Sequence, residues 1–120
     1  METGETARSL KIYISSTDKY KSSSLYEVIV YAAKEFGITG ATVFRGIMGF
    51  GSSSRVHSQK LLEINDKIPI IIEITDCQEK ILSFIEHIKP YIVESEKGCL
   101  ITIQETTIVM LKSGEKRQQF

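Results

Sequence analysis

The chain has 120 residues, 42% of them hydrophobic and 25% charged, which is the size and composition of one soluble globular domain. Its 15 Lys and Arg residues balance its 15 Asp and Glu residues, so the sequence disfavours a surface devoted to nucleic acid, which usually carries a basic excess. The first residues lack the apolar core of a signal peptide, and no apolar run approaches the roughly 20 residues that span a bilayer. We therefore expect a cytoplasmic protein without direct membrane insertion, forming one domain over 1–120 with flexible tails at 1–7 and 116–120.

The first half of the chain predicts a strand, a helix and a second strand. Residues 8–15 alternate in polarity, as in a half-buried strand, with an apolar face of Leu10, Ile12 and Ile14. After a polar connection, Ser24 and Glu27 have the spacing of a capping box. A helix is predicted from there to residue 36, and Gly37 ends it in the left-handed conformation. Its apolar stripe is Leu25, Val28, Ile29, Ala32, Ala33 and Phe36. Residues 41–44 are β-branched and aromatic enough for a second strand.

The second half repeats this order after a long loop at 44–60. Residues 61–64 are compatible with a short strand, and the nearly continuous apolar run at 68–74 predicts a central strand. A second helix is expected to be capped by Thr75 or Asp76 and ended by Pro90. Its core stripe is Ile81, Phe84, Ile85 and Ile88. Residues 100–111 predict one interrupted strand or two short ones.

The order of these elements predicts an α+β fold. Two βαβ halves give the ferredoxin-like βαββαβ sandwich, an antiparallel sheet with two helices on one face. The other face stays open, although the strand at 68–74 has apolar residues on both sides. Self-association is the simplest way to cover such a face.

The loop carries the strongest local chemistry. Its sequence is FRGIMGFGSSSRVH at 44–57, and five of the eight glycines lie between 37 and 51. No Asp or Glu occurs from residue 36 to residue 62, whereas Arg45, Arg55 and Lys60 do. Glycine backbone and arginine side chains both suit phosphate or carboxylate. The alternative is a solvated connection in which the glycines only form turns.

Catalytic and metal chemistry find little support, so we expect a protein that is not an enzyme, has no catalytic residues and requires no cofactor. Cys77 and Cys99 are isolated, which predicts two reduced, partly buried thiols rather than a disulfide or a zinc site. His57 has no Cys or carboxylate partner in its segment, and His87 is expected to be an exposed helix residue. Glu73 could pair with an arginine or with the amino group of adenine, or simply face an edge.

Several segments resemble the PII signalling proteins. These are GITGATV at 37–43, GFG at 49–51 and the closing SGEK at 113–116. A closer similarity is to a PII-like branch known only as a domain of unknown function, which shares the patterns of TDKYKSSSLYE at 17–27 and ATVFRGIMGFGSSSRVH at 41–57. The resemblance covers about residues 8 to 115.

The resemblance implies a homotrimer with adenine-nucleotide clefts between subunits, and a long loop that contacts a membrane transporter, a channel or an enzyme. It places Gly40, Ala41 and Thr42 beside the base. It places Gly49, Phe50 and Gly51 on the phosphate side, followed by Ser52 where PII proteins commonly have arginine. Of two basic positions on the PII last strand, Met110 has lost the charge and Lys112 keeps it.

The sequence also departs from PII proteins in the phosphate loop before the last strand. That loop is reduced to EKG at 96–98, and its usual lysine position holds Cys99. Arg45 and Arg55 are candidates to compensate from the long loop. A nucleotide with fewer phosphates, or another small anion, is therefore as credible a ligand as ATP.

The preferred hypothesis is a regulatory sensor that binds an adenine nucleotide or related anion and switches a partner protein through the 44–60 loop. The alternative is a structural or interaction trimer without a small ligand, docking to a transporter or channel. A divalent-metal role ranks last, because no cluster of ligands is evident. RNA binding would need aromatic residues on the open sheet face, where Tyr13 is the one candidate.

Overall fold

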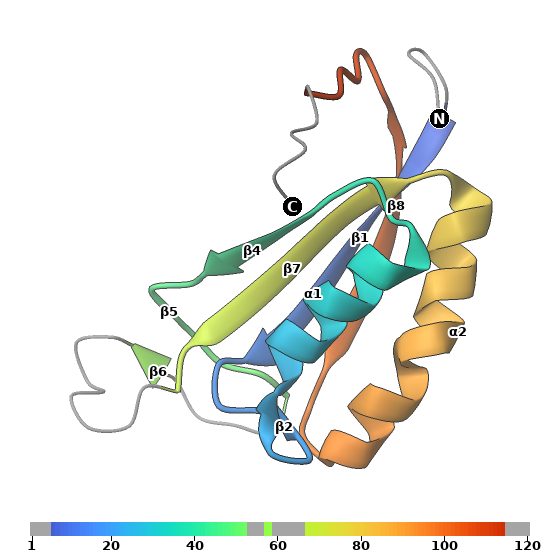
Figure 1. Cartoon of the computed structure of the whole chain (residues 1–120). Coiled ribbons are helices and arrows are strands. Elements are labelled where there is room, and N and C mark those ends of the chain that lie inside the picture. Colours follow the sequence, from blue (N-terminus) through green and yellow to red (C-terminus); the bar gives the residue numbers. More distant parts are fainter. Residues whose placement is uncertain (1–5, 53–56, 59–66, 115–120) are drawn as a thin grey trace.

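The computed structural model describes residues 6–52, 57–58 and 67–114. Its main sheet has four antiparallel strands, and both helices lie on one face of it (Figure 1). The strands are β1 (Thr6–Ser15), β4 (Ala41–Arg45), β7 (Pro69–Asp76) and β8 (Leu100–Thr107), in the order β4-β7-β1-β8. The helices are α1 (Leu25–Phe36) and α2 (Gln78–Ser95). The predicted ferredoxin-like arrangement is confirmed.

The two central strands build the core because their side chains alternate between the two faces. Leu10 pairs with Ile74 and Ile12 pairs with Ile72, so these side chains share the face that the helices cover. The predicted helix stripes meet them there, with α2 following its prediction closely. The fully buried large side chains of this layer are Leu10, Ile12, Leu25, Ile29, Ile70, Ile72, Ile74, Ile81, Phe84 and Ile88.

Two short ladders occupy stretches that the sequence predicted as irregular. Strands β2 (Lys19–Tyr20) and β3 (Ser23–Ser24) form a tight hairpin in the polar connection, with Lys21 at φ 56° in its turn. In the long loop, β5 (Met48–Gly49) pairs with β6 (His57–Ser58). The loop is therefore a hairpin where the structure describes it. The possible strand at 61–64 lies outside the described residues.

The predicted helix caps are wrong in their chemistry. Ser24 does stand at the N-cap of α1, but its side chain makes no capping hydrogen bond. The first backbone N–H, that of Leu25, instead donates to the backbone oxygen of Asp18 at 2.8 Å. The N-cap of α2 is Cys77, neither Thr75 nor Asp76. Local sequence favoured a side-chain cap in both places, and the N-cap residue forms such a bond in neither.

The predicted end of the second helix is also wrong, because Pro90 lies inside α2, which continues to Ser95. Proline removes one N–H donor from the helix ladder. The continuation is favoured because its last turn packs on the protein, with the Tyr91 ring 4.9 Å from that of Tyr20. At the C-terminal end, the sheet holds one strand, β8, and the chain that follows it lies near the start of β4, where Ile108, Met110 and Leu111 share a hollow with Thr39 and Gly40 (Figure 1).

Candidate ligand site

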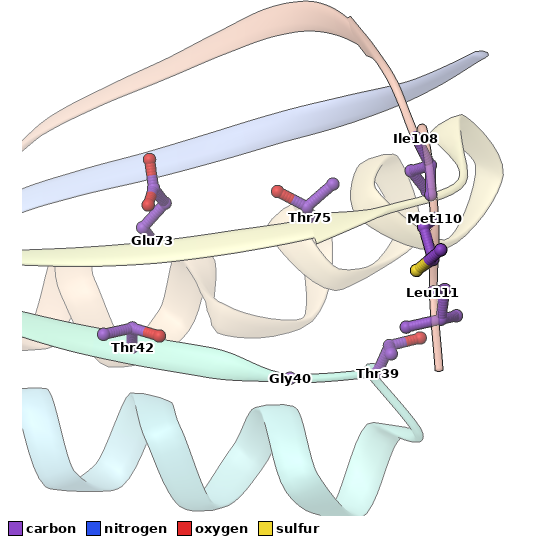
Figure 2. Close-up of a pocket in the computed structure, with 8 residues that line it drawn as sticks. All are labelled: Thr39, Gly40, Thr42, Glu73, Thr75, Ile108, Met110 and Leu111. Carbon is purple, nitrogen blue, oxygen red and sulfur yellow. The ribbon is translucent and has the colours of Figure 1, made fainter. Parts of the chain in front are cut away.

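A hollow of about 310 Å³ lies on the open face of the sheet, where β4 begins and β7 ends. Thr42 stands opposite Glu73 in the β4–β7 register, which brings their side chains to the same face. The segment after β8 forms the third side, and its side chains point into the space (Figure 2). The lining consists of Thr39, Gly40, Thr42, Glu73, Thr75, Ile108, Met110 and Leu111.

The chemistry of this hollow is polar on the sheet side and apolar on the opposite side. The hydroxyls of Thr42 and Thr75 can each donate or accept, the hydroxyl of Thr39 donates to Asp76 at 3.1 Å, and the carboxylate of Glu73 can accept. Glu73 lies 3.8 Å from the ammonium of Lys11, with both side chains partly exposed. Such an exposed ion pair holds its partners weakly, so Glu73 remains able to accept a hydrogen bond from a ligand.

A second hollow of about 240 Å³ lies on the other side of the same turn, against α1. It shares Thr39 and Gly40 with the first, and those two residues form a wall between the hollows. Lys34 supplies the one cation of its otherwise mostly apolar lining, which is Val30, Ala33, Lys34, Ile38, Thr39, Gly40 and Ala41. An added Cβ at Gly40 would meet no atom within 4 Å, so packing within the chain does not itself require glycine at this position.

The turn between α1 and β4 is fastened from α2. Gly37 adopts φ 87° at the C-cap of α1, a conformation that suits glycine, and its carbonyl accepts from the Lys80 ammonium at 2.9 Å. One oxygen of Asp76 accepts from the backbone N–H and the hydroxyl of Thr39, at 3.0 and 3.1 Å. The other oxygen accepts from the N–H of Cys77 at 2.7 Å.

These contacts set the protonation of Asp76. Burial by itself raises the pKa of this carboxyl, but the hydrogen bonds from Thr39 and Cys77, helped by the charge of Lys80, outweigh burial. The pKa of Asp76 therefore lies below the ordinary value of 3.8. The carboxylate stays ionised near neutral pH and acts only as an acceptor.

The predicted site residues divide into two groups in the structure. Gly40 and Thr42 line the first hollow, and Ala41 lines the second together with Gly40. The remaining described residues of the prediction line neither hollow, and all except Gly49 are exposed: Arg45, Gly49, Phe50, Gly51, Ser52 and Lys112. Arg55 lies outside the described residues.

Sequence reasoning missed most of the remaining wall. Thr39 stands inside the GITG motif but was not chosen, and Thr75 could have been found because it is two residues from Glu73 and so shares its face. No sequence pattern pointed to Ile108 or Leu111, since their position depends on the path of the chain after β8. Met110, noted only for its missing charge, is part of the apolar side.

Two loop glycines have a packing reason that is independent of any ligand. An added Cβ would lie 3.2 Å from the Pro69 Cβ at Gly46, and 3.1 Å from the Pro69 Cγ at Gly49. The N–H of Gly46 also donates to the Pro69 carbonyl at 2.8 Å. The hairpin therefore lies close against the start of β7, and glycine permits that approach.

The open face also carries an apolar row across all four strands. The registers align Leu100, Tyr13, Ile71 and Phe44 from one sheet edge to the other. Leu100 is 57% exposed and Phe44 47% exposed. Nearby on the chain, the hairpin exposes Ile47, Met48 and Phe50. A contiguous apolar surface of this kind is typical of a contact with another protein surface.

Other predicted features can be compared with the described part of the chain. Cys77 and Cys99 are free and partly buried, as expected. His87 is exposed, with its ring 5.2 Å from that of Phe36. Among residues 6–52, 57–58 and 67–114, no three His, Cys, Asp or Glu side chains group as metal ligands would, and no helix has the length and apolar character needed to cross a membrane.

Sequence comparison places the chain among proteins of one family. The model of the family DUF190, described as "Uncharacterized ACR", matches residues 7–108. A UPF0166 protein of Aquifex aeolicus (strain VF5) is 33% identical over 102 residues, which cover 85% of this chain and 92% of that protein. A UPF0166 protein of Methanocaldococcus jannaschii is 37% identical over 75 residues, covering 62% of this chain and 68% of the relative.

Structure comparison gives the same fold in a protein of distant sequence. CPII, a nitrogen regulatory PII-like protein from Thiomonas intermedia K12, superposes with a TM-score of 0.66 at 16% identity. The match covers 87% of this chain and 89% of CPII, whose structure was solved bound to ADP, AMP and bicarbonate. At this identity the likeness establishes the shared fold.

Proposed function

The chain belongs to the DUF190 family and has the fold of PII-like proteins, and from this premise we propose that it is a non-catalytic sensor of an adenine nucleotide. The nucleotide binds at the hollow on the open sheet face, with its base near Gly40, Ala41 and Thr42. Its phosphates extend towards the 44–60 loop and Lys112. Binding orders this loop and so changes its affinity for a partner protein, which is all that such a switch requires.

The observation that carries the proposal is the coincidence of motif and geometry at residues 39–42. The GITGATV segment, from which the resemblance started, supplies Gly40 and Thr42 to the first hollow. Glu73 stands beside them as an acceptor that suits the amino group of adenine. A concave surface with a few convergent polar groups and apolar walls is the usual form of a small-molecule site.

The apolar row supports the assembly that the proposal needs. Covering Leu100, Tyr13, Ile71 and Phe44 with further copies of the chain would remove them from water. We propose a homotrimer in which neighbouring copies complete the hollow and bring basic loop residues to the phosphates. Fewer cations than in PII proteins favour a nucleotide with one or two phosphates over ATP, because each charge-assisted hydrogen bond contributes about 1.5–3 kcal/mol.

Calorimetric titration with AMP, ADP and ATP tests the function, with Gly40→Ala and Gly114→Ala as a matched pair. Both glycines have open space around an added Cβ, so both variants should fold with unchanged stability. The new methyl group at residue 40 would project beside the bound base and should weaken nucleotide affinity about 10-fold. Residue 114 lines neither hollow, and its variant should bind as the wild type does. Absence of binding by the wild type, or equal affinities for the two variants, would contradict the proposed site.

A docking trimer without a small ligand is the second candidate, favoured by the exposure of Ile47, Met48 and Phe50, the last of which is 73% exposed. A panel of nucleotides in a thermal unfolding experiment separates the two functions. A ligand present at 100 times its dissociation constant stabilises the native state by about 2.7 kcal/mol. The sensor therefore predicts a clear rise in Tm with at least one adenine nucleotide, whereas the docking trimer predicts none.

A further inference from the structure

Asp76 is the most tightly held polar side chain near the hollow, although it is not part of the lining. It is 2% exposed and accepts three hydrogen bonds, two from Thr39 and one from the first residue before α2. Burying an ionised carboxylate requires such compensation. Here the compensation joins three elements at one point, namely the end of β7, the start of α2 and the turn that leads into β4.

The hydrogen bonds that Thr39 donates to Asp76 determine what Thr39 can offer to a ligand. Because an ionised carboxylate has no proton to give, the hydroxyl of Thr39 must donate its proton to Asp76 in the 3.1 Å contact. Its oxygen then keeps only acceptor capacity for any other partner. The backbone N–H of Thr39 is likewise engaged, at 3.0 Å. Thr39 therefore presents an acceptor and a methyl group, and it cannot donate to an anion.

The position of Thr39 makes this polarity relevant to recognition. Thr39 and Gly40 form the wall shared by the two hollows, and Gly40 has no side chain that would hold the wall from within. The position of Gly40 therefore depends on the hydrogen bonds that hold Thr39 to Asp76. Glu73, which stands further along the hollow opposite Thr42, is a second and separate acceptor (Figure 2). Acceptors suit ligand donors, such as an amino group or a ribose hydroxyl, better than phosphate.

We propose that Asp76 is a positioning residue of the ligand hollow, which holds the Thr39–Gly40 wall in place and leaves the Thr39 oxygen as an acceptor for a donor group of the ligand. This inference rests on the proposed function for the identity of the ligand. Its structural half, the holding of the wall, can be tested without any nucleotide.

Three substitutions separate the contacts. Asp76→Ala removes both carboxylate oxygens, so Thr39 loses both of its bonds and Cys77 loses its one. Thr39→Val removes the hydroxyl and leaves the backbone bond, and Thr39→Ser restores the hydroxyl. Lys80→Met is the matched control, since it removes the 2.9 Å bond to Gly37 in the same turn without touching Thr39.

Amide hydrogen exchange on the full chain without nucleotide tests the wall. Asp76→Ala should speed exchange of the Thr39 amide about 10-fold, while the amides of Ile12 and Ile72 in the sheet keep their protection. Lys80→Met should leave the Thr39 amide unchanged. Unchanged exchange at Thr39 in a folded Asp76→Ala protein would overturn the proposal. Should Asp76→Ala fail to fold, the Thr39 variants and the ligand titrations decide instead.

Titration with ADP and with two analogues, 2′-deoxy-ADP and inosine diphosphate, tests the acceptor. Thr39→Val should lower ADP affinity about 3- to 10-fold, as expected for one lost hydrogen bond, and Thr39→Ser should recover it. If the Thr39 oxygen accepts from the adenine amino group, Thr39→Val should not lower the affinity for inosine diphosphate any further. If it accepts from the ribose 2′-hydroxyl, the same variant should not lower the affinity for 2′-deoxy-ADP any further. The acceptor role would be overturned if Thr39→Val lowered the affinity for both analogues as much as it lowers that for ADP. It would also be overturned if Thr39→Ser failed to restore ADP affinity. If wild-type protein binds none of these ligands, the proposed function fails, and the exchange experiment still decides whether Asp76 holds the wall.

Discussion

The two faces of the sheet use the same strands for different purposes. On the covered face, Leu10, Ile12 and Ile72 are fully buried under the helices. One residue further along each strand, the open face carries a charged pair, a half-exposed apolar row and the polar side of the ligand hollow. Residues that form the core and residues that we propose for recognition thus alternate with a period of two. A substitution should therefore change one property or the other according to whether its position is odd or even in the strand.

The largest expected contrast is between two neighbours in β7. Ile72→Ala leaves a cavity in the core and should lower the free energy of unfolding by about 2–5 kcal/mol. Ile71→Ala removes a side chain from the partly exposed row and should cost about 1 kcal/mol or less while weakening self-association. Urea unfolding at one protein concentration measures the first effect, and sedimentation equilibrium measures the second. Equal losses of stability, with assembly unaffected, would remove the distinction between the faces.

A smaller effect is expected at Asp76, the polar residue that ends the buried series of β7. Because its pKa is lowered in the folded state, its contribution to stability is complete above the unfolded value of 3.8 and is lost as the pH falls through the folded value. Asp76→Asn should cost about 1–3 kcal/mol at pH 7, and the difference in stability between the two proteins should narrow as the pH falls below 3.8. Urea unfolding between pH 7 and pH 2 measures this, and parallel curves over the whole range would contradict it.

The smallest effect concerns a thiol that packs against the covered side. Burial, together with the negative charge of Asp18, raises the pKa of Cys99 to about 11 from an ordinary value of 9.0. Only the thiolate reacts with alkylating agents, so Cys99 should react about 100-fold more slowly at pH 8 than a thiol of ordinary pKa. Iodoacetamide labelling of the Cys77→Ser variant, followed by mass spectrometry, isolates Cys99. Labelling as fast as that of a free cysteine would show that the covered side is open there.

The sequence predicted best where local pattern and tertiary packing agree. Helical spacing with Gly37 placed α1 at the bounds that the structure shows. Alternation placed β1, although the strand begins at Thr6 rather than at residue 8, and the buried Ala7 lies in it rather than in a flexible tail. Prediction was wrong where a distant contact decided the outcome. Pro90 is a local stop signal, yet the packing of Tyr91 on Tyr20 continues α2 beyond it. Local pattern was also insufficient at Ser24, which stands at the N-cap of α1 without the expected side-chain bond.

The candidate site was predictable in part for the same reason. Gly40 and Thr42 come from one continuous motif, so a local resemblance was sufficient to choose them. Thr39 gains its role only through Asp76, which is 37 residues away in the sequence. The apolar side of the hollow depends on where residues 108–111 run after leaving the sheet. No local sequence pattern indicates that this segment comes back to lie beside Thr39 and Gly40.

The central position of β1 has a consequence for how the protein is made. Tyr13 finds its neighbours in Ile71 and Leu100, so the first strand of the sheet to be synthesised pairs with two of the last. At about 5–20 residues per second, the ribosome needs roughly 5–20 s between completing β1 and completing β8. Until β7 is complete at Asp76 the strand β1 has neither of its partners, and until β8 is complete it lacks one of them. Sheets built from such distant pairings fold slowly, which makes the nascent chain, more than the finished one, the form most exposed to aggregation and most dependent on chaperones.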